Sequence, residues 1–254
     1  MYADSFLNEV AIITGAGQGI GFEIAKQLCI NGACVLLNDI DETLAQQAAK
    51  KISTHGNCIA LGGDAADPIF IQTMVDEAVN KFGKLTIAIA NAGITLFGDF
   101  FDYKPAALQN VMNLNISGSF LLTQAAANKM KQQNNGGSIL LMSSVTGHQA
   151  HKNLAAYGIT KAALEMLAKT LVVELSPFNI NINAIAPGAT VTERTTEDKD
   201  YLNTWSRITP MGKPATVEDI ANAALFMIAP SSKHITGQSL IIDGGWTSVS
   251  PSPY

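Results

Sequence analysis

Short apolar runs alternate with longer amphipathic stretches along the whole chain. The apolar runs are rich in Val, Ile, Leu and Ala, and they predict strands at residues 10–13, 34–38, 57–61, 86–90, 138–142, 180–185 and 239–242. Apolar residues recur with helical spacing between them, which predicts helices at residues 20–30, 42–52, 68–82, 104–132, 156–175 and 217–227.

The alternation of strands and helices predicts the fold class. Strands that are each followed by a helix form parallel sheets, and right-handed crossovers place the helices on both faces. The strands are apolar throughout, as expected for a sheet that is covered on both sides. We therefore predict one α/β domain over residues 1–254, with a doubly wound Rossmann-type fold and a mostly parallel seven-stranded sheet.

One polar, threonine-rich segment interrupts this alternation. Residues 193–214 contain Trp205 and show no clear period, so we predict an irregular stretch. A loop of this length in a compact domain usually covers a binding site. We call residues 193–214 the lid.

Composition narrows the class of protein. The chain has 254 residues, of which 47% are hydrophobic, and its net charge of −5 gives no reason to expect nucleic acid or an anionic membrane as a partner. No run approaches the roughly 20 apolar residues that cross a bilayer, and no basic-then-apolar leader precedes residue 20. We therefore expect a cytoplasmic protein.

The cysteines and histidines suggest no metal site. Cys29, Cys34 and Cys58 have no CxxC spacing, which fits free structural thiols better than a disulfide framework. No cluster of His, Asp and Glu has the spacing of metal ligands, so we expect no bound metal.

A glycine-rich loop follows the first predicted strand. It reads TGAGQGIG at residues 14–21, and the first predicted helix begins within it. Glycines let backbone N–H groups approach a pyrophosphate at the positive end of a helix. The pattern alone is weak, but its place between a strand and a helix is what a dinucleotide site requires. We expect these loop residues to bind the cofactor: Gly15, Gln18, Gly19, Ile20 and Gly21.

An acidic residue ends the second predicted strand. Asp39 follows Asn38, and a carboxylate in this place can accept hydrogen bonds from both ribose hydroxyls of NAD. The same charge would repel the 2′-phosphate of NADP, and Gln18 and Ile40 stand where a basic partner would be expected. We therefore predict NAD as the cofactor. A simple turn residue at the end of the strand is the alternative role.

A serine, a tyrosine and a lysine suggest carbonyl chemistry. Ser144 follows the fifth predicted strand, and Tyr157 comes thirteen positions later. Lys161 is four residues beyond Tyr157 and therefore shares its face of the predicted helix. A nearby ammonium favours the phenolate of a tyrosine, and a serine hydroxyl can stabilise charge on a substrate oxygen. A Tyr-x-x-x-Lys pair alone also occurs on solvated helices.

Taken together, these motifs resemble the short-chain dehydrogenase/reductase family along nearly the whole chain. The resemblance rests on the glycine loop, Asn91-Ala92-Gly93, Asn115, Ser144, Tyr157-x-x-x-Lys161 and Pro187-Gly188, in the family's order and spacing. One small departure is Ala90, where many members carry a second asparagine.

The resemblance implies a role for each matching residue. Tyr157 would be the general acid/base, Ser144 would contact the substrate oxygen, and Lys161 would tune Tyr157 and hold the nicotinamide ribose. Asn115 would anchor a water that links Lys161 to solvent. The remaining implied cofactor contacts are Asp64 and Ala65 at the adenine, Asn91, Ala92 and Gly93 along the cofactor, and Pro187, Gly188, Thr190 and Thr192 at the carboxamide and diphosphate.

The substrate is much less defined than the cofactor. We expect a pocket lined by residues 94–97, 145–151, Leu154, Ala189 and the lid around Trp205 and Ile208, most of them apolar or small. Three cations could clamp a carboxylate but are better interpreted as solvated: Lys152, Arg194 and Arg207. His148 and His151 would either meet the substrate or be exposed.

Three functions remain open at this point. The main prediction is an NAD(H)-dependent oxidoreductase that interconverts a secondary alcohol, such as a sugar or polyol, and its carbonyl. The second is reduction of 3-oxoacyl groups on acyl carrier protein, although Asn135 and Phe178 stand where such enzymes carry basic residues. The third is a non-catalytic NAD(H) sensor, which would not need all four implied catalytic residues. By resemblance, we also expect a homotetramer that pairs the two long helices.

Overall fold

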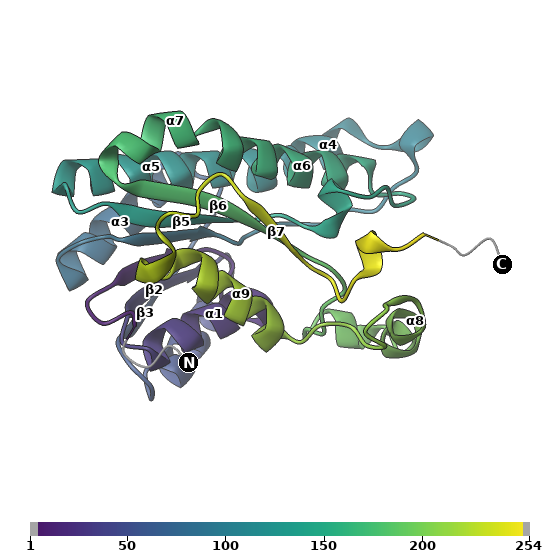
Figure 1. Cartoon of the computed structure of the whole chain (residues 1–254), viewed down its shortest axis with the longest axis horizontal. Coiled ribbons are helices and arrows are strands. Elements are labelled where there is room, and N and C mark those ends of the chain that lie inside the picture. Colours follow the sequence, from purple (N-terminus) through teal and green to yellow (C-terminus); the bar gives the residue numbers. More distant parts are fainter. Residues whose placement is uncertain (1–4, 251–254) are drawn as a thin grey trace.

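Within residues 5–250, which the computed structural model describes, seven strands form one parallel sheet between two layers of helices (Figure 1). Neighbouring strands are parallel throughout, in the order β3-β2-β1-β4-β5-β6-β7. The strands are β1 (Val10–Ile13), β2 (Cys34–Asp39), β3 (Cys58–Gly62), β4 (Ile87–Ala90), β5 (Gly137–Met142), β6 (Ile180–Pro187) and β7 (Ser239–Ile242). The predicted fold class is confirmed.

Two hydrophobic cores cover the two faces of the sheet. One core contains α1 (Gly19–Ile30), α2 (Glu42–Ile52) and α9 (Val217–Ile228), and the other contains α3 (Pro68–Phe82), α5 (Ser119–Gln133) and α6 (Ala155–Thr170). Successive strand residues point to opposite faces, so Ile13 packs in the first core and Ile12 in the second. This is why apolar residues predominate on both faces of the central strands.

Local signals in the sequence place the ends of several helices. The Asp41 carboxylate accepts a hydrogen bond from the Leu44 amide at 3.0 Å and begins α2. Thr216 and Asp219 form a reciprocal capping box that begins α9. The left-handed Gly83, with a φ of 85°, ends α3.

Two predicted helices are interrupted. The predicted helix at 104–132 divides into α4 (Pro105–Met112), a π-helical turn (Asn113–Gly118) and α5. The predicted helix at 156–175 ends at Thr170, and the short α7 (Val172–Leu175) follows. Such π turns occur mostly at functional sites, and this one contains Asn115.

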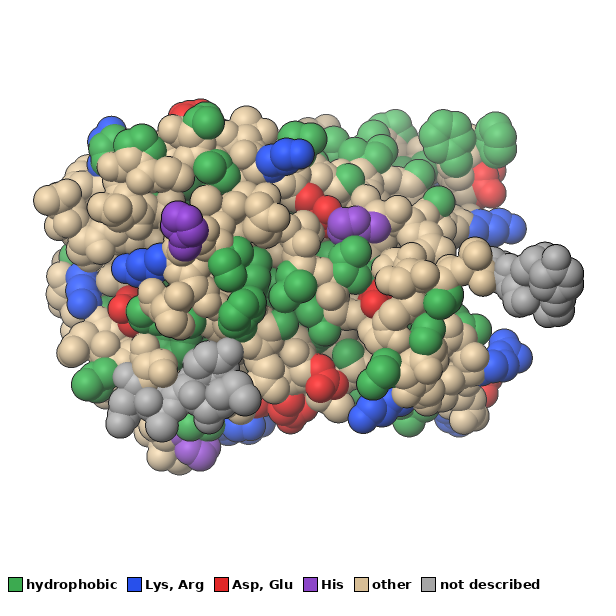
Figure 2. Space-filling view, viewed as in Figure 1, with side chains coloured by type: hydrophobic (Ala, Val, Ile, Leu, Met, Phe, Trp, Pro, Cys, Tyr) green, Lys and Arg blue, Asp and Glu red, His purple; other side chains and the backbone are tan. Residues whose placement is uncertain are grey.

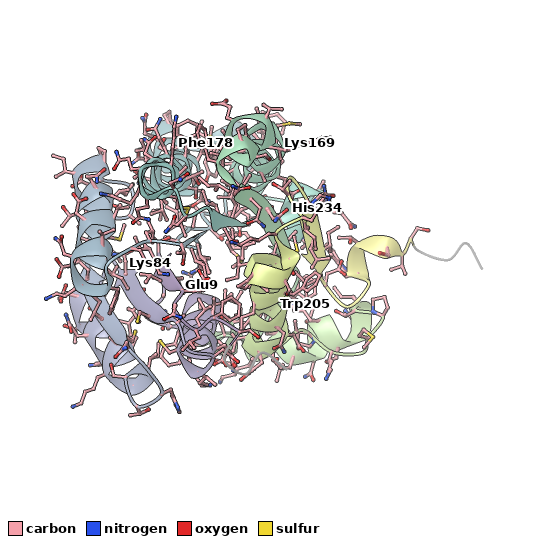
Figure 3. The ribbon with its side chains drawn as sticks, turned by 60° about the vertical axis from the view of Figure 1, so that its left-hand side comes forward. Glu9, Lys84, Lys169, Phe178, Trp205 and His234 are labelled. Atoms are coloured by element: carbon pink, nitrogen blue, oxygen red, sulfur yellow. The ribbon has the colours of Figure 1, made fainter. Side chains whose placement is uncertain are left out.

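The lid is irregular only in part, so that prediction is wrong for two of its segments. It contains a 3₁₀ turn (Thr195–Glu197) and the helix α8 (Tyr201–Ile208), which lies at one end of the molecule (Figure 1). Trp205, labelled in Figure 3, meets Trp246 edge-on with 5.6 Å between the ring centroids. Trp246 in turn stacks on His151 at 5.0 Å. Aromatic contacts therefore hold α8 against the C-terminal segment.

Strand β7 lies at the edge of the sheet and keeps its side chains exposed. Leu240 and Ile241 are more than a third exposed, as is Phe226 of α9. Figure 2 shows hydrophobic side chains in the middle of the face it displays, over β7 and α9.

No helix within residues 5–250 is long and apolar enough to span a membrane.

Candidate active site

A cavity of about 810 Å³ opens at the carboxyl ends of the strands, next to β1 and β4. The strand order reverses between these two strands, and ligands of open α/β sheets bind at such a point. Of the predicted site residues, only Asn115 is missing from the lining. The structure therefore brings together residues that lie as far apart in sequence as Gly15 and Thr192.

The glycine loop packs closely against the end of β4. Gly15 has a φ of 61°, and a Cβ added to it would lie 2.8 Å from the Ala92 Cα atom. The Asn91 side-chain amide donates hydrogen bonds to the Thr14 and Gly15 carbonyls at 2.9 and 2.8 Å. Asn91 therefore fixes the loop in addition to facing the cavity.

The N-terminus of α1 faces open space in the cavity. Gly19 has a φ of 64°, and a Cβ there would find no atom closer than 3.7 Å, at Thr192. Gln18 makes no side-chain cap and the first turn carries no acid, so no side chain of the helix itself occupies its positive end; the Glu193 carboxylate of the lid lies 3.8 Å from a Cβ built on Gly19. This cradle fits the diphosphate of a dinucleotide.

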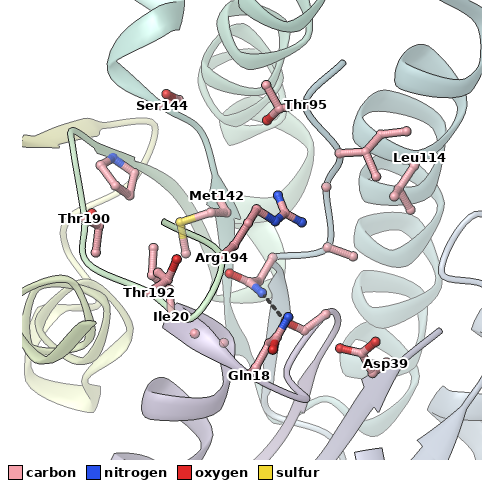
Figure 4. A pocket seen from close by; sticks show the side chains of 18 of the residues that line it. Gln18, Ile20, Asp39, Thr95, Leu114, Met142, Ser144, Thr190, Thr192 and Arg194 are labelled. Atoms are coloured by element: carbon pink, nitrogen blue, oxygen red, sulfur yellow. Dashed lines mark hydrogen bonds between the residues drawn. The ribbon is translucent and has the colours of Figure 1, made fainter. Parts of the chain in front are cut away.

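The Asp39 carboxylate lies on another part of the cavity wall (Figure 4). Its Oδ2 atom accepts a hydrogen bond from the Gly17 amide at 3.0 Å, and its Oδ1 atom accepts one from the Asp41 amide at 3.3 Å. Each carboxylate oxygen has a second lone pair, so both can still accept a hydroxyl. The site fits the ribose of NAD.

The predicted catalytic residues meet where β5 ends beside α6. Lys161 is 3% exposed, its Nζ atom donates to the Met142 carbonyl at 2.8 Å, and it lies 5.3 Å from the centroid of the Tyr157 ring. Tyr157 is half-buried and lines the cavity. Ser144 also lines the cavity, and its Oγ atom accepts a hydrogen bond from the Thr146 amide at 3.3 Å.

Asn115 lies one layer behind the cavity wall. Its side-chain amide exchanges hydrogen bonds with the backbone of Ile94 at 2.9 and 3.0 Å and donates to Thr160 Oγ1 at 3.1 Å. A Cβ on Gly93 would lie 3.2 Å from Asn115 Oδ1 and 3.3 Å from Lys161 Nζ. Glycine at position 93 therefore lets the chain pass close to both side chains.

The first part of the lid is held by hydroxyl groups. The Tyr201 hydroxyl accepts a hydrogen bond from the Thr190 amide at 3.0 Å and donates to the Thr190 carbonyl at 3.2 Å. Burial raises the pKa of Tyr201, so this phenol stays protonated near neutral pH. Thr195 Oγ1 accepts from the Thr192 amide at 2.8 Å. These bonds fix Thr190 and Thr192 on the cavity wall.

Arg194 is exposed, as expected from the sequence for a solvated charge, and it also belongs to the cavity wall. It lines the wall, and Figure 4 shows its guanidinium pointing into the open space. Its position depends on how the lid folds after Thr192, which no motif records. The other basic residue of the lining is Lys161.

The expected substrate pocket is only partly present in this lining. Ile94, Thr95 and Phe97 contribute to the wall, whereas these predicted residues do not: Leu96, residues 145–151, Leu154, Ala189, Trp205 and Ile208. His148 Nε2 lies 2.8 Å from the Glu165 carboxylate and does not face the cavity. This partner could not be predicted from the sequence, because Glu165 lies on another element.

The cysteines lie away from the cavity as free thiols. A hydrogen bond with Cys58, together with burial, raises the pKa of Cys29 far above its usual range, so it stays protonated. Residues 5–250 contain no group of three or more His, Cys, Asp and Glu side chains that could hold a metal.

Comparisons with known proteins agree with this geometry. Residues 15–247 match a family model described as enoyl-(acyl carrier protein) reductase. The chain is 32% identical to L-rhamnose 1-dehydrogenase (NAD(P)(+)) of Azotobacter vinelandii, over 94% of this chain and 96% of that one. It is 33% identical to a 3alpha-hydroxysteroid dehydrogenase of Mediterraneibacter gnavus, over 93% and 96%.

A solved structure shows the same likeness in three dimensions. The crystal structure of a short-chain type dehydrogenase/reductase from Mycobacterium marinum superposes with a TM-score of 0.91 at 31% identity, covering 97% of this chain and 99% of that one. The sequence motifs had predicted this relationship, and it is confirmed. The protein belongs to the short-chain dehydrogenase/reductase family of oxidoreductases that act on CH–OH groups.

Proposed function

We propose that this enzyme interconverts a secondary alcohol and its carbonyl with NAD(H), using Tyr157 as the general acid/base. The observation that carries the proposal is the buried ammonium of Lys161 beside the Tyr157 ring, 5.3 Å from its centroid, in one cavity with the glycine loop and Asp39. A buried cation favours the phenolate of a neighbouring tyrosine.

Each residue at the end of β5 has a task in this proposal. A bound nicotinamide would supply the hydride chemistry, as acceptor from the alcohol carbon or as donor to the carbonyl carbon. Tyr157 takes the alcohol proton in one direction and supplies it in the other. Ser144 donates a hydrogen bond to the substrate oxygen, and Lys161 stabilises the tyrosine anion. Asn115 secures the backbone at Ile94, which follows Gly93 on the part of the wall that would face the cofactor.

The preference for NAD over NADP rests on the charge of Asp39. The carboxylate is held by two backbone amides at the point where the adenosine ribose is expected to lie. The basic residues of the lining are Lys161 and Arg194, and neither forms an ion pair with Asp39. An added 2′-phosphate would therefore meet a negative charge without a compensating partner.

Two observations support a hydroxylated substrate such as a sugar or polyol. Relatives named L-rhamnose 1-dehydrogenase match nearly the whole chain. The wall next to the proposed catalytic residues combines the hydroxyl of Thr95 with apolar Ile94 and Phe97, which suits a ring with polar and apolar faces.

Reduction of a carrier-bound 3-oxoacyl group is the competing activity, and the family model's description favours keeping it. An acidic carrier protein needs cations for docking. Phe178 is not basic, but Lys131 Nζ lies 4.2 Å from the centroid of its ring and supplies one charge there.

The test is a panel of initial rates that follows nicotinamide absorbance. NAD⁺ and NADP⁺ are each combined with L-rhamnose, other sugars, polyols and simple secondary alcohols, and NADH and NADPH with a 3-oxoacyl thioester. We expect oxidation of a hydroxylated substrate, faster with NAD⁺. Thioester reduction that prefers NADPH would overturn both the substrate and the cofactor proposals, and no turnover with any pair would favour the sensor.

A further inference from the structure

A hydrogen-bonded group of side chains lies directly behind Ser144. Ser143 is buried, and its Oγ atom lies 2.6 Å from Glu165 Oε1 and 2.9 Å from the Lys161 carbonyl. His148 Nε2 lies 2.8 Å from the same Glu165 oxygen. Glu165 and His148 do not line the cavity, so neither meets substrate or cofactor there.

Glu165 is the acceptor that joins these groups. The Ser143 hydroxyl has one proton and donates to one acceptor at a time, and a separation of 2.6 Å is typical of donation to a carboxylate. The imidazole of His148 donates through Nε2 when it is protonated there, whether neutral or cationic. One carboxylate oxygen therefore binds the end of β5 and the loop that follows it.

The contacts of Glu165 surround the proposed catalytic residues. Along α6, Tyr157, Lys161 and Glu165 follow one another at four-residue intervals and share one face. Ser143 precedes Ser144, and His148 follows the 3₁₀ turn (Val145–Gly147) that Ser144 caps. Fixing Ser143 and His148 to Glu165 therefore fixes the segment that carries Ser144 against the helix that carries Tyr157.

The backbone of the loop after Ser144 also packs closely against α6, next to Glu165. A Cβ added to Gly147 would lie 3.0 Å from the Ala162 amide nitrogen and 3.1 Å from Glu165 Oε1. The loop thus runs directly against α6 at this point, without an intervening side chain. Small shifts of the loop along the helix would change the geometry at Ser144.

We propose that Glu165 is a positioning residue: by binding Ser143 and His148 it sets the distance between Ser144 and the Tyr157–Lys161 face of α6. The inference rests on the proposed function, because it assigns Ser144 and Tyr157 to the same substrate oxygen. A displacement of about 1 Å between reacting groups costs about a hundredfold in rate, so positioning of this kind is worth measuring.

The first experiment compares E165A with E165Q. The alanine removes the acceptor, whereas the glutamine keeps a carbonyl oxygen at the same place without charge. We expect E165A to lower kcat by about tenfold or more and E165Q to stay within about threefold of the wild type. Binding of NADH, measured by fluorescence titration, should be unchanged in both. E77A is the control, because it removes the carboxylate of an ion pair with Lys81 on α3.

Hydrogen exchange tests positioning independently of turnover. The amides of Gly147, His148 and Gln149 donate to carbonyls within the loop, at 2.9, 3.0 and 2.9 Å. We expect them to exchange faster in E165A but not in E165Q or E77A, because the loop loses its attachment only when the acceptor is removed. If E165A does not fold, S143A, which removes one of the two groups that Glu165 binds, is expected to lower kcat by a smaller factor.

Several results would overturn the inference. One is a kcat of E165A equal to that of the wild type, another is equal loss in E165A and E165Q, and a third is unchanged exchange at 147–149 in E165A. A wild-type enzyme that oxidises no alcohol would instead refute the proposed function. In that case the exchange experiment still decides whether Glu165 holds the loop.

Discussion

At the scale of single residues, the charges around the cavity bear on which cofactor the enzyme prefers. Asp39, Asp64 and Glu193 line it, together with the cations Lys161 and Arg194. The Lys161 ammonium donates a hydrogen bond to the Met142 carbonyl.

The glycine loop, Asp39 and the Tyr-x-x-x-Lys pair could be predicted from sequence because each is a short local pattern. The roles of Arg194 and Glu165 could not, because the place of Arg194 depends on how the lid folds and the partners of Glu165 come from other elements.

Replacing Asp39 should change the choice of cofactor. In D39N the side chain keeps its shape but loses the charge that opposes a 2′-phosphate, so NADPH should bind more tightly relative to NADH, by about tenfold. The measurement is the ratio of the two Kd values by fluorescence titration, with D102N on the surface as the control. An unchanged ratio in D39N would show that Asp39 does not face the ribose.

Replacing Arg194 should weaken binding of the dinucleotide. A guanidinium that reaches the diphosphate adds charge-assisted hydrogen bonds, so R194Q should raise the Kd of NADH by about tenfold and reduce its dependence on salt. The chain has one other arginine, Arg207, also in the lid and absent from the lining, which makes R207Q a matched control. Equal affinity in the two variants would place Arg194 outside the cofactor site.

At the scale of elements, the sequence predicted the parts whose signals are periodic or lie at helix ends. The strands and the helices α1, α2, α3 and α9 match their predicted positions to within one or two residues. The π turn was missed because one additional residue per turn hardly disturbs the apolar spacing of a long helix. Helix α8 was missed because it has only eight residues and depends on tertiary contacts, among them those of Trp205 and Tyr201.

The turn after β7 should make stability depend on pH. Burial alone would raise the pKa of Asp243, but hydrogen bonds from Thr247, Gly245 and Trp246 outweigh it and hold the pKa below its usual value. The ionised form is therefore stabilised by folding. Its contribution is complete above the unfolded-state pKa of about 4 and is lost as the pH falls through the lower folded-state value.

The variant D243N tests this dependence. The wild type should exceed it in free energy of unfolding by about 1 kcal/mol at pH 7, because three hydrogen bonds lose their charged acceptor. Urea unfolding at a series of pH values should show the gap closing as the pH falls below about 4. A gap of the same size at every pH would mean that the carboxylate charge is not involved.

At the scale of the whole molecule, exposed apolar side chains lie where partner subunits could cover them. Ile159 and Met166 of α6 and Val173 of α7 are more than half exposed. Phe226, Leu240 and Ile241 are more than a third exposed and belong to the apolar region over α9 and β7 (Figure 2). Clusters of this kind usually mark interfaces. These apolar regions could not be predicted from the charge and composition of the chain. Their positions depend on which faces of the helices and of the sheet no other element covers.

We predict that the protein is a homotetramer in solution. Light scattering coupled to gel filtration should give about four times the chain mass of 26.8 kDa at micromolar concentration. A charged residue at an exposed apolar position, as in M166E, should reduce the mass because like charges would meet across an interface. A monomer mass for the wild type would contradict this prediction.

The proposed role of Tyr157, transfer of the substrate proton beside bound NAD(H), is tested most directly by the turnover of the best substrate by Y157F, together with NADH binding to the same protein. We expect a loss of at least about a hundredfold in kcat, because the phenylalanine packs alike but has no hydroxyl to transfer a proton. The affinity for NADH should stay close to that of the wild type. Unchanged turnover in Y157F would contradict the proposed role of Tyr157.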